Sequence, residues 1–363
     1  MPDPVSIRHT LLTQDAPAIA PQLPSFFARY QADINDALRK ELAPYRLPLY
    51  DTLRYYLGWM DEYGRASEPA EGKRLRPTLC LLACEAAGGD PADSLSAAVA
   101  LEYVHNFSLI HDDIEDGDRI RHHRPTLWAV WGEPTAIVSG NALVTVADLA
   151  IQGSLARGVP EEAACMAAEA LTDHYLRMME GQYLDIDFEH RMDVSVDEYL
   201  DMIERKTGAL ITCSVYLGAL VGSASRPEGA LVGSLRRVGH ELGRIFQIRD
   251  DVLGVWGGPE TGKPVGADIE RKKKSLPVVH ALSHARGSAK RRLESTFAQP
   301  TLDGGDVEQV LEVMEDLRTR DYCQELADAR WLKARSMIKS LPLAGDSAAD
   351  FLELGEFLLV RES

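Results

Sequence analysis

Cysteine and aromatic residues are scarce in this sequence, and negative charge far outweighs positive charge. Its 363 residues include five cysteines and 7% aromatic residues, and the formal net charge is −17. The cysteines form no C-x-x-C pair, and Cys80 and Cys84 are spaced for packing in an apolar helix, which together favour a reducing cytoplasm. The acidity argues against a general nucleic-acid-binding protein, because an anionic partner then needs local basic clusters or bridging metal ions.

The sequence also lacks the apolar segments typical of secretion and membrane insertion. The N-terminus has no basic region followed by an apolar core, so we expect no signal peptide. Residues 207–225 are uncharged, but they contain three glycines and several hydroxyl residues. We therefore expect a buried helix there and no transmembrane segment.

Alternation of apolar and polar residues is almost absent, so β-sheet is not expected and the predicted fold class is all-α. A proline-rich arm, residues 1–24, is expected to be mobile and to precede one helical domain, residues 25–363. Two helices are expected between residues 25 and 63, with a break near Pro44 and Pro48. The other expected helices span 76–87, 91–116, 134–157, 160–184, 196–223, 228–253, 273–287, 306–318 and 320–340.

The most informative motif in the sequence is an acidic one, with carboxylates at Asp112, Asp113, Glu115 and Asp116. Asp90 and Pro91 are suited to begin a helix, so these acids fall at the C-terminal end of a long helix. The helix dipole disfavours acids at that end, and Asp112 repels Asp116 one turn away. A Mg²⁺ ion would relieve this repulsion, because it binds one or two carboxylates together with phosphate oxygens.

A second apolar helix pattern ends in Asp250 and Asp251. Two facing helices with acids at matching depth can form a metal cage in a helical bundle. Each acidic pair alone is a weak signal, but the two together favour one shared site for a metal-bound phosphate.

Three basic clusters could bind that phosphate. Lys73, Arg74 and Arg76 lie between a glycine loop and a helix start, a suitable diphosphate site, although a solvated basic loop is an equally good interpretation. The second cluster, residues 119–124, contains Arg121 as its best functional candidate; its two adjacent histidines do not share a helix face, which argues against zinc. Lys206 and Thr207 precede the uncharged helix, and the alternative is a lysine whose stem packs on apolar surface.

Two further segments have the composition of a binding site. Gln182 and Asp185 are three residues apart and therefore share one helix face. The glycine-rich loop over residues 257–268 is long for a compact domain and resembles a lid. We expect the basic run that follows it, residues 271–274, to be partly solvated and partly turned towards substrate.

Taken in order, these motifs resemble the trans-type (all-E) isoprenyl diphosphate synthases over about residues 50–290. The matching residues are Gly72 to Arg74, Arg76, Pro77, the acids of 112–116, Arg121, Arg124 to Thr126, Gly181, Gln182, Asp185, Lys206, Thr207, Phe246, Gln247, Asp250, Asp251, Gly262 to Pro264 and Asp268. The resemblance implies a single-domain helical bundle around a central cavity, usually in a homodimer. It implies Mg²⁺-dependent condensation of isopentenyl diphosphate with an allylic diphosphate.

The resemblance also implies residue roles. Asp112, Asp116 and Asp250 would bind Mg²⁺, with three ions when substrate is bound, and Asp113 would support them. Isopentenyl diphosphate would contact Lys73, Arg76 and His105, with His122 as a weaker contact. The allylic diphosphate would contact Arg121, Lys206, Thr207, Gln247 and Lys263. Of these, Arg121, Lys206 and Lys263 would join the acids in catalysis.

The sequence departs from the family pattern at Gly254, His122 and Asn141, where aspartate, arginine and aspartate are frequent. These departures motivate a different hypothesis, a non-catalytic or regulatory subunit that binds prenyl diphosphate. A diphosphate-ionising terpene cyclase is a further alternative, although it would not need Lys73 and Arg76. A phosphohydrolase that uses His111 and Asp112 would need more histidines at metal spacing.

The residues before the first acidic motif predict product length. Ser108 and Phe107 lie about one turn before Asp112, where the helical rise places them about 6–8 Å below the metals, and Val104 lies one turn further. Ser108 is small, whereas Phe107 is bulky enough to form a floor. An aromatic residue there resembles geranylgeranyl diphosphate synthases, so we predict a twenty-carbon product, with fifteen carbons as the alternative.

Overall fold

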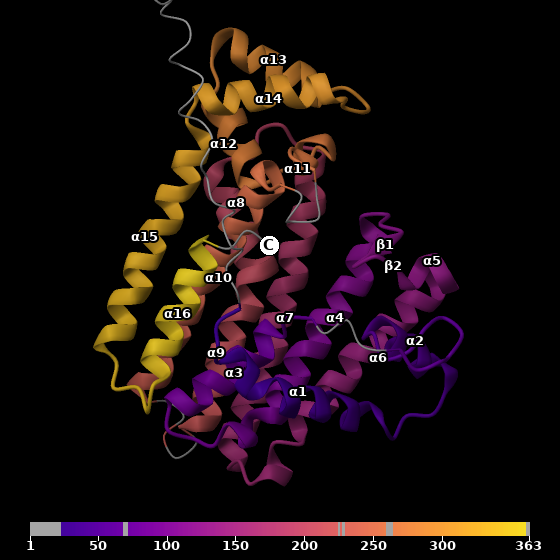
Figure 1. Ribbon diagram of the computed structural model, residues 1–363, viewed down its shortest axis with the longest axis vertical. Coiled ribbons are helices and arrows are strands. Elements are labelled where there is room, and N and C mark those ends of the chain that lie inside the picture. The colour runs from indigo at the N-terminus through magenta and orange to yellow at the C-terminus, as the bar shows by residue number, and fades with distance from the viewer. Residues whose placement is uncertain (1–22, 68–71, 224–225, 227–228, 259–263, 361–363) are drawn as a thin grey trace, which may run out of the picture.

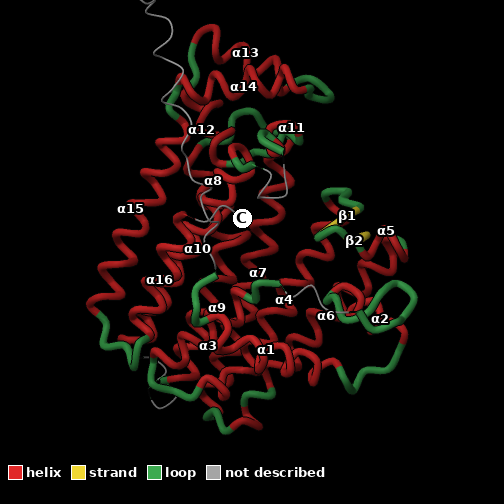
Figure 2. The backbone as a smooth tube through the Cα atoms, viewed as in Figure 1, coloured by secondary structure: helices red, strands yellow, loops and turns green. Residues whose placement is uncertain are grey.

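The computed structural model describes residues 23–67, 72–223, 226, 229–258 and 264–360. Within these ranges the protein is almost entirely helical (Figures 1 and 2). The first half contains α1 (Phe27–Leu42), α2 (Pro48–Tyr56), α3 (Leu75–Ala86), η1 (Pro91–Ser94), α4 (Leu95–Glu115), β1 (Ile120–Arg121), β2 (Arg124–Pro125), α5 (Leu127–Trp131), α6 (Glu133–Gln152), η2 (Leu155–Arg157) and α7 (Glu161–Glu189). The second half contains α8 (Val196–Ile203), η3 (Glu204–Gly208), α9 (Ala209–Gly222), α10 (Ala230–Trp256), α11 (Ala267–Glu270), α12 (Leu276–His284), α13 (Gly287–Phe297), α14 (Gly304–Asp316), α15 (Thr319–Ser340) and α16 (Ser347–Val360).

The core is built from helices that bury most of their surface. Helix α9 is buried along nearly its whole length, as its uncharged sequence predicts, and it packs between α3, α7 and α10. Helix α4 packs mainly along α6. Because α4 and α10 both belong to this core, their acidic ends are fixed in position by apolar packing rather than by surface loops.

A smaller apolar cluster lies at one end of the molecule. It joins Val255 at the end of α10 to residues of α11–α14, including Ile269, Val278, Leu293 and Met314. Figure 1 shows α13 and α14 across this end, with α15 running away from it and α16 returning beside α15. Helix α10 therefore runs from the main core, which includes Ile245, into this second cluster, which includes Val255.

The helical segment Glu133–Arg157 is long and apolar enough to cross a membrane by length and composition alone. This is weak support for a membrane span, because core helices of soluble proteins meet the same criterion. In this structure α6 lies along α4 in the core.

The predicted all-α class is confirmed, with small differences. Residues 120–125 form a hairpin in which His122 and His123 have φ of 48° and 61°, typical of a two-residue turn that matches strand twist. Helices α5, α11, α13 and α16 were not expected, and the predicted helix 196–223 contains a π-helical turn at η3. The predicted arm lies outside the described residues except for its last two positions.

Candidate active site

The first acidic motif lies where the sequence predicts it, at the C-terminal end of α4. The Asp90 carboxylate accepts a hydrogen bond from the Ala92 amide at 2.9 Å, which fixes the start of this segment. At the other end, Asp112 is partly buried and Asp116 is the residue that terminates the helix. The two carboxylates are one turn apart, as a shared cation requires.

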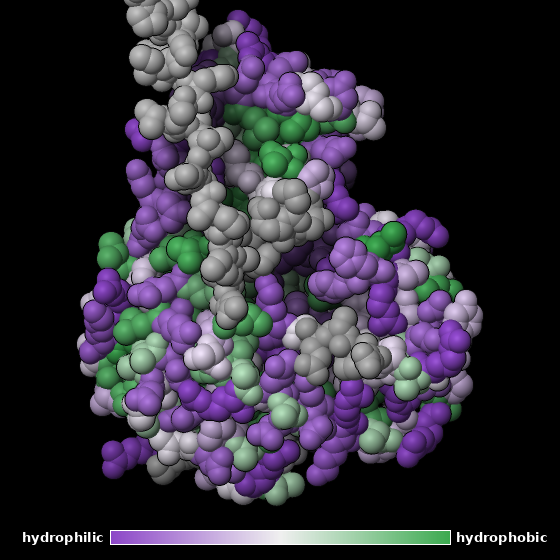
Figure 3. Space-filling view, viewed as in Figure 1, coloured by the Kyte–Doolittle hydropathy of each residue, from purple (hydrophilic) through white to green (hydrophobic). Residues whose placement is uncertain are grey.

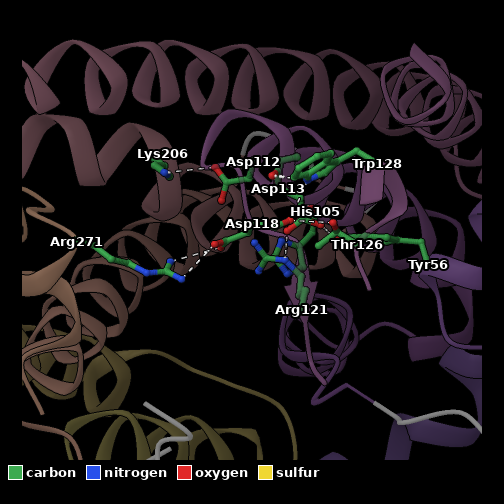
Figure 4. Close-up of polar contacts among 11 residues, drawn as sticks. Tyr56, His105, Asp112, Asp113, Asp118, Arg121, Thr126, Trp128, Lys206 and Arg271 are labelled. Atoms are coloured by element: carbon green, nitrogen blue, oxygen red, sulfur yellow. Dashed lines mark hydrogen bonds and ion pairs between the residues drawn. The ribbon is translucent and has the colours of Figure 1, made fainter. Parts of the chain in front are cut away.

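Asp113 points away from its neighbours and is 1% exposed. Its carboxylate accepts hydrogen bonds from Arg121 Nε at 2.5 Å and from the Tyr56 hydroxyl at 3.2 Å. Figure 4 shows Arg121 and Tyr56 meeting at Asp113 while Asp112 faces Lys206. Asp113 therefore holds Arg121 in place and is turned away from the position of a metal ligand.

Lys206 connects three elements at the centre of the site. Its Nζ lies 2.5 Å from an Asp185 oxygen on α7 and 3.5 Å from Asp112 Oδ1 on α4. Burial lowers the pKa of Lys206, but the Asp185 and Asp112 carboxylates outweigh burial and the pKa is raised, so the ammonium group is charged at neutral pH. Gln182, one turn before Asp185 on α7, donates a hydrogen bond to the Glu115 carboxylate at the end of α4 at 2.6 Å.

The second acidic pair divides into two different environments. Asp250 is exposed, whereas Asp251 is buried and accepts hydrogen bonds from the Tyr199 hydroxyl at 2.6 Å, Gln247 Nε2 at 2.9 Å and the Leu276 amide at 3.1 Å. Burial raises the pKa of Asp251 to about 7. Asp250 is therefore the more accessible carboxylate of the pair, and Asp251 fixes Gln247 and the start of α12.

Lys273 is a site residue that the sequence did not single out. Burial lowers the pKa of Lys273, yet four carboxylates outweigh it and raise the pKa; in decreasing order of effect they are Asp268, Asp185, Asp251 and Asp250. The only signal in the sequence was the basic run 271–274. Its other members lie elsewhere: Arg271 pairs with Asp118 at 3.1 Å, and Lys274 donates to the Glu189 carbonyl.

The carboxylates at the ends of α4 and α10 share one lysine, Lys273, while Lys206 serves those of α4 and α7. The pKa of Asp116 is raised to about 6 by desolvation and by Asp112, while Lys206 and Lys273 partly counteract these effects. Lys273 in turn interacts with Asp250. Figure 3 shows the surface hollowed between the part that carries α11 and the part that carries β1 and β2.

This donor set fits Mg²⁺. No group of three His, Cys, Asp or Glu side chains is assembled as a metal cage within the described ranges. Mg²⁺ does not require one, because it retains waters and substrate phosphates alongside one or two carboxylates. Burial, followed by the neighbouring Asp112 carboxylate, raises the pKa of Asp116, and a cation between the two acids would stabilise their charged forms.

The predicted isopentenyl site is basic and partly buried. Burial lowers the pKa of Arg76 to about 10, so it stays charged at neutral pH, and its Nε is a buried donor without a hydrogen-bond partner. Burial and Arg76 hold the pKa of His105 well below its ordinary value, so His105 is neutral. Lys73 is exposed. The adjacent Arg74 forms a buried ion pair with Glu102 at 2.6 Å, which ties this segment to α4.

The hairpin positions the second basic cluster. His122 occupies the turn, and burial followed by Arg121 lowers its pKa, so it is neutral at pH 7 and a weaker phosphate contact than arginine. Arg124 donates to the carbonyl oxygens of Tyr55 and Met60, which is a structural role. His122 and His123 belong to no group of metal ligands among the described residues.

The structure explains one departure from the family pattern. A Cβ at Gly254 would lie 2.1 Å from Asp268 Oδ2, so the Asp268 carboxylate occupies the space that a residue at 254 would need. Asn141 is exposed on α6, and its carbonyl accepts a hydrogen bond from Thr145.

The remaining residues predicted for the site lie in the core, in helix α4 or in the turn η3. Phe107 and Val104 are buried in the main core, and the Phe107 ring meets His111 edge to face at 4.9 Å. The Ser108 hydroxyl donates to the His105 carbonyl. Thr207 lies beside Lys206 in η3 and is partly buried, whereas Lys263 lies outside the described residues.

Comparisons with known proteins agree with this geometry. The family model described as polyprenyl synthetase matches residues 58–314. A (2E,6E)-farnesyl diphosphate synthase of Mycobacterium tuberculosis is 36% identical, covering 100% of this chain and 97% of its own length. A geranylgeranyl diphosphate synthase of the same organism is 38% identical, covering 92% and 93%.

The fold is shared with solved structures. The polyprenyl synthetase of Streptomyces coelicolor A3(2) superposes with a TM-score of 0.84 at 33% identity, covering 92% of this chain and 98% of that one. The family model and the full-length relatives lead to one conclusion: the chain belongs to the polyprenyl synthetase family.

Proposed function

We propose that this protein is a Mg²⁺-dependent trans-prenyltransferase that condenses isopentenyl diphosphate with an allylic diphosphate. The observation that carries the proposal is the convergence of two lysines on the acids of the site: Lys206 meets Asp112 of α4 and Asp185 of α7, and Lys273 interacts with the acids at the ends of both α4 and α10. Cations and carboxylates that converge in this way suit a metal-bound diphosphate. The names of the relatives support the same reaction class.

Asp112, Asp116 and Asp250 would bind Mg²⁺, with three ions in the substrate complex. Bound Mg²⁺ would neutralise diphosphate charge and so make it a better leaving group. Lys206 and Lys273, both charged at neutral pH, would add fixed positive charge on the allylic side. Arg121, held by Asp113, and Lys263 complete this proposed set, with Thr207 and Gln247 as polar contacts.

Lys73, Arg76 and His105 would hold isopentenyl diphosphate, and the unpartnered Nε of Arg76 is a donor suited to a phosphate oxygen. The allylic C–O bond breaks and the diphosphate leaves with the electron pair. The double bond of isopentenyl diphosphate then attacks the allylic cation, and orientation of both substrates makes this step local. Loss of a proton to the departing diphosphate forms the new double bond, so no protein base is required.

We propose geranylgeranyl diphosphate as the main product, and farnesyl diphosphate as the alternative. The relatives include synthases of both names, at similar identity. The buried aromatic ring of Phe107 supports the shorter range of products, because it would block an extending chain five residues before Asp112.

We further propose a cytoplasmic homodimer in which residues 25–363 form one domain. All five cysteines are free, which suits a reducing compartment. Helix α7 carries an exposed apolar stripe of Leu176, Met179, Tyr183 and Ile186, and α6 adds Ile137, Val138 and Leu149. A second copy of the chain would cover this surface, and light scattering of the purified protein tests it.

Product analysis of the purified protein tests the main proposal. We would incubate it with Mg²⁺, labelled isopentenyl diphosphate and either geranyl or farnesyl diphosphate, then separate the dephosphorylated products by chain length. Incorporation that stops at twenty carbons is the expected result. Binding of both substrates without incorporation would instead identify a non-catalytic subunit.

A further inference from the structure

The π-helical turn η3 lies in the middle of an otherwise continuous helical segment and carries Lys206 and Thr207, the residues that the proposed function assigns to the allylic diphosphate. It interrupts α8 and α9 at Glu204–Gly208, and the residues before and after it keep helical backbone angles. π-Turns of this kind insert a residue and rotate the side chains on either side of it, and they are frequent at functional sites. Here the turn presents Lys206 towards Asp112 and Asp185.

One side of the turn rests on α7. A Cβ at Gly181 would lie 2.2 Å from the Lys206 backbone nitrogen, so the two backbones touch and no larger residue fits. This contact limits how far Lys206 can move towards α7. The end of the turn is likewise close to α10, since a Cβ at Gly243 would lie 2.9 Å from Gly208 Cα.

The other side of the turn is tied to α10 by a charged cluster. Glu204 is the first residue of the turn, and its carboxylate accepts hydrogen bonds from His240 Nε2 at 2.9 Å and from Arg244 Nη2. His240 and Arg244 are four residues apart and therefore lie on one face of α10. The three side chains are only partly exposed.

Glu204 is held as a carboxylate by these partners. Hydrogen bonds, with that from His240 first, lower the pKa of Glu204 to about 2, and hydrogen bonds to Glu204 and Glu241 raise the pKa of His240 to about 9. The cluster is therefore charged at neutral pH. His240 Nδ1 is also 3.7 Å from a carboxylate oxygen of the buried Glu241, which pairs with Lys333 of α15 at 2.5 Å, so the charged cluster extends to α15.

Glu204 and Lys206 are two residues apart and so point in different directions from the turn. Glu204 faces α10, while Lys206 faces α4 and α7. We propose that Glu204, His240 and Arg244 are positioning residues that set the place of Lys206 and Thr207 relative to α10, the helix that carries Asp250. The effect would be specific to the allylic diphosphate, since the ion pairs of this cluster within the described part of the chain lead to α10 and α15 and not to Arg76 or His105.

The proposal rests on the proposed role of Lys206 in allylic diphosphate binding. We would measure KM for the allylic and the isopentenyl substrates, and the calorimetric Kd of an allylic thiodiphosphate, whose C–S bond resists ionisation. Glu204→Gln is the first variant because it removes the charge with little change in shape. We expect the allylic KM and the Kd to rise about tenfold, as loss of a charge-assisted contact predicts, while the isopentenyl KM stays within about twofold.

A matched pair of variants tests the hydrogen bond itself. His240→Leu removes the donor and should reproduce the effect of Glu204→Gln. His240→Gln places an amide N–H near the position of the imidazole Nε2 and should restore the allylic KM. Asp201→Asn is the control, because Asp201 forms an exposed ion pair with Arg205 in the same segment without reaching α10.

Thermal unfolding of every variant identifies a general loss of stability. An unchanged allylic KM in Glu204→Gln, or an equal rise of both KM values, would overturn the positioning role. Lys206→Ala separates this failure from that of the proposed function. If Lys206→Ala raises the allylic KM and Glu204→Gln does not, only the positioning role is wrong; if Lys206→Ala has no effect, the assigned role of Lys206 is wrong as well.

Discussion

Replacing Asp251 by asparagine should impair activity while leaving the fold nearly intact. The Asp251 carboxylate accepts three hydrogen bonds: the Tyr199 hydroxyl and the Leu276 amide meet Oδ2, and the Gln247 amide meets Oδ1. Asparagine has the same shape but keeps only one acceptor oxygen, and its nitrogen is a donor. One of the two positions must therefore receive an N–H group.

Hydrogen-bond energies decide which position changes. If the asparagine nitrogen faced Leu276, the backbone N–H of that residue would lose its acceptor in a buried position, at a cost of about 1–3 kcal/mol. If it faced Gln247, the glutamine amide could rotate and accept the hydrogen bond with its oxygen, so little stability would be lost. We therefore expect Asp251→Asn to reverse the Gln247 amide and to lower the free energy of unfolding by about 1 kcal/mol or less.

In the proposed site, the Gln247 N–H group would donate to the allylic diphosphate. The reversed amide would place its oxygen, which is an acceptor, in the position of that donor. Loss of one hydrogen bond to a charged ligand corresponds to about 1.5–3 kcal/mol, or about 10- to 150-fold in kcat/KM. The assay is a double-mutant cycle with Gln247→Leu, using kcat/KM for the allylic substrate and thermal unfolding in parallel. Because both changes act through one amide, Asp251→Asn should add little to Gln247→Leu. Full activity in Asp251→Asn, or independent additive losses in the double variant, would refute this reasoning.

Four other substitutions test separate parts of the site. Lys73→Ala and Arg76→Ala should raise KM for isopentenyl diphosphate by removing charge-assisted contacts worth about 1.5–3 kcal/mol each, and a change confined to the allylic KM would mean that the two substrate sites were assigned in reverse. Phe107→Ala should lengthen the products by one or more five-carbon units, measured by chromatography, although loss of its buried ring costs stability of up to about 3–5 kcal/mol; an unchanged product distribution would remove Phe107 as the floor. Gly254→Asp, which introduces the aspartate frequent in the family, should lower the melting temperature and activity, because its Cβ would meet Asp268 Oδ2 at 2.1 Å; a gain in either property would contradict the close contact.

The sequence predicted the parts of the fold that depend on local pattern. Asp90 begins its helical segment as expected, and the acids from Asp112 to Asp116 end it. The uncharged segment around α9 is buried, as its composition indicated. Helix α16 was missed, although it buries Phe351, Leu354 and Leu358, and α13 was missed because only a short stripe around Leu293 and Phe297 is apolar.

Pattern alone could not separate neighbouring residues with the same chemistry. Asp250 and Asp251 are equivalent in sequence, and only packing against Tyr199 and Leu276 buries one of them. In the same way, the three lysines at 272–274 have the same chemistry, and the backbone directs them to different partners. Lys273 interacts with Asp116 at the end of α4 and with Asp250 of α10, whereas Lys272 and Lys274 donate to backbone carbonyls.

The π-turn at η3 was equally invisible to sequence reasoning. Helical periodicity continues through residues 196–223, so one extra residue in a turn leaves no clear change of pattern. The ion pair between Glu204 and Arg244 joins residues of two different helices, and no local rule relates such positions. The sequence therefore indicated that Lys206 belongs to the site, but not what holds it there.

We propose above all that the acidic ends of α4 and α10 act as one metal-diphosphate site. The most direct measurement compares Mg²⁺-dependent turnover of the purified protein with that of Asp112→Ala, Asp250→Ala and the double variant, with circular dichroism as the control for folding. We predict that each single variant loses turnover by orders of magnitude and that the double variant loses little more, because residues that act as a unit are not additive. Full turnover in either single variant would contradict the claim.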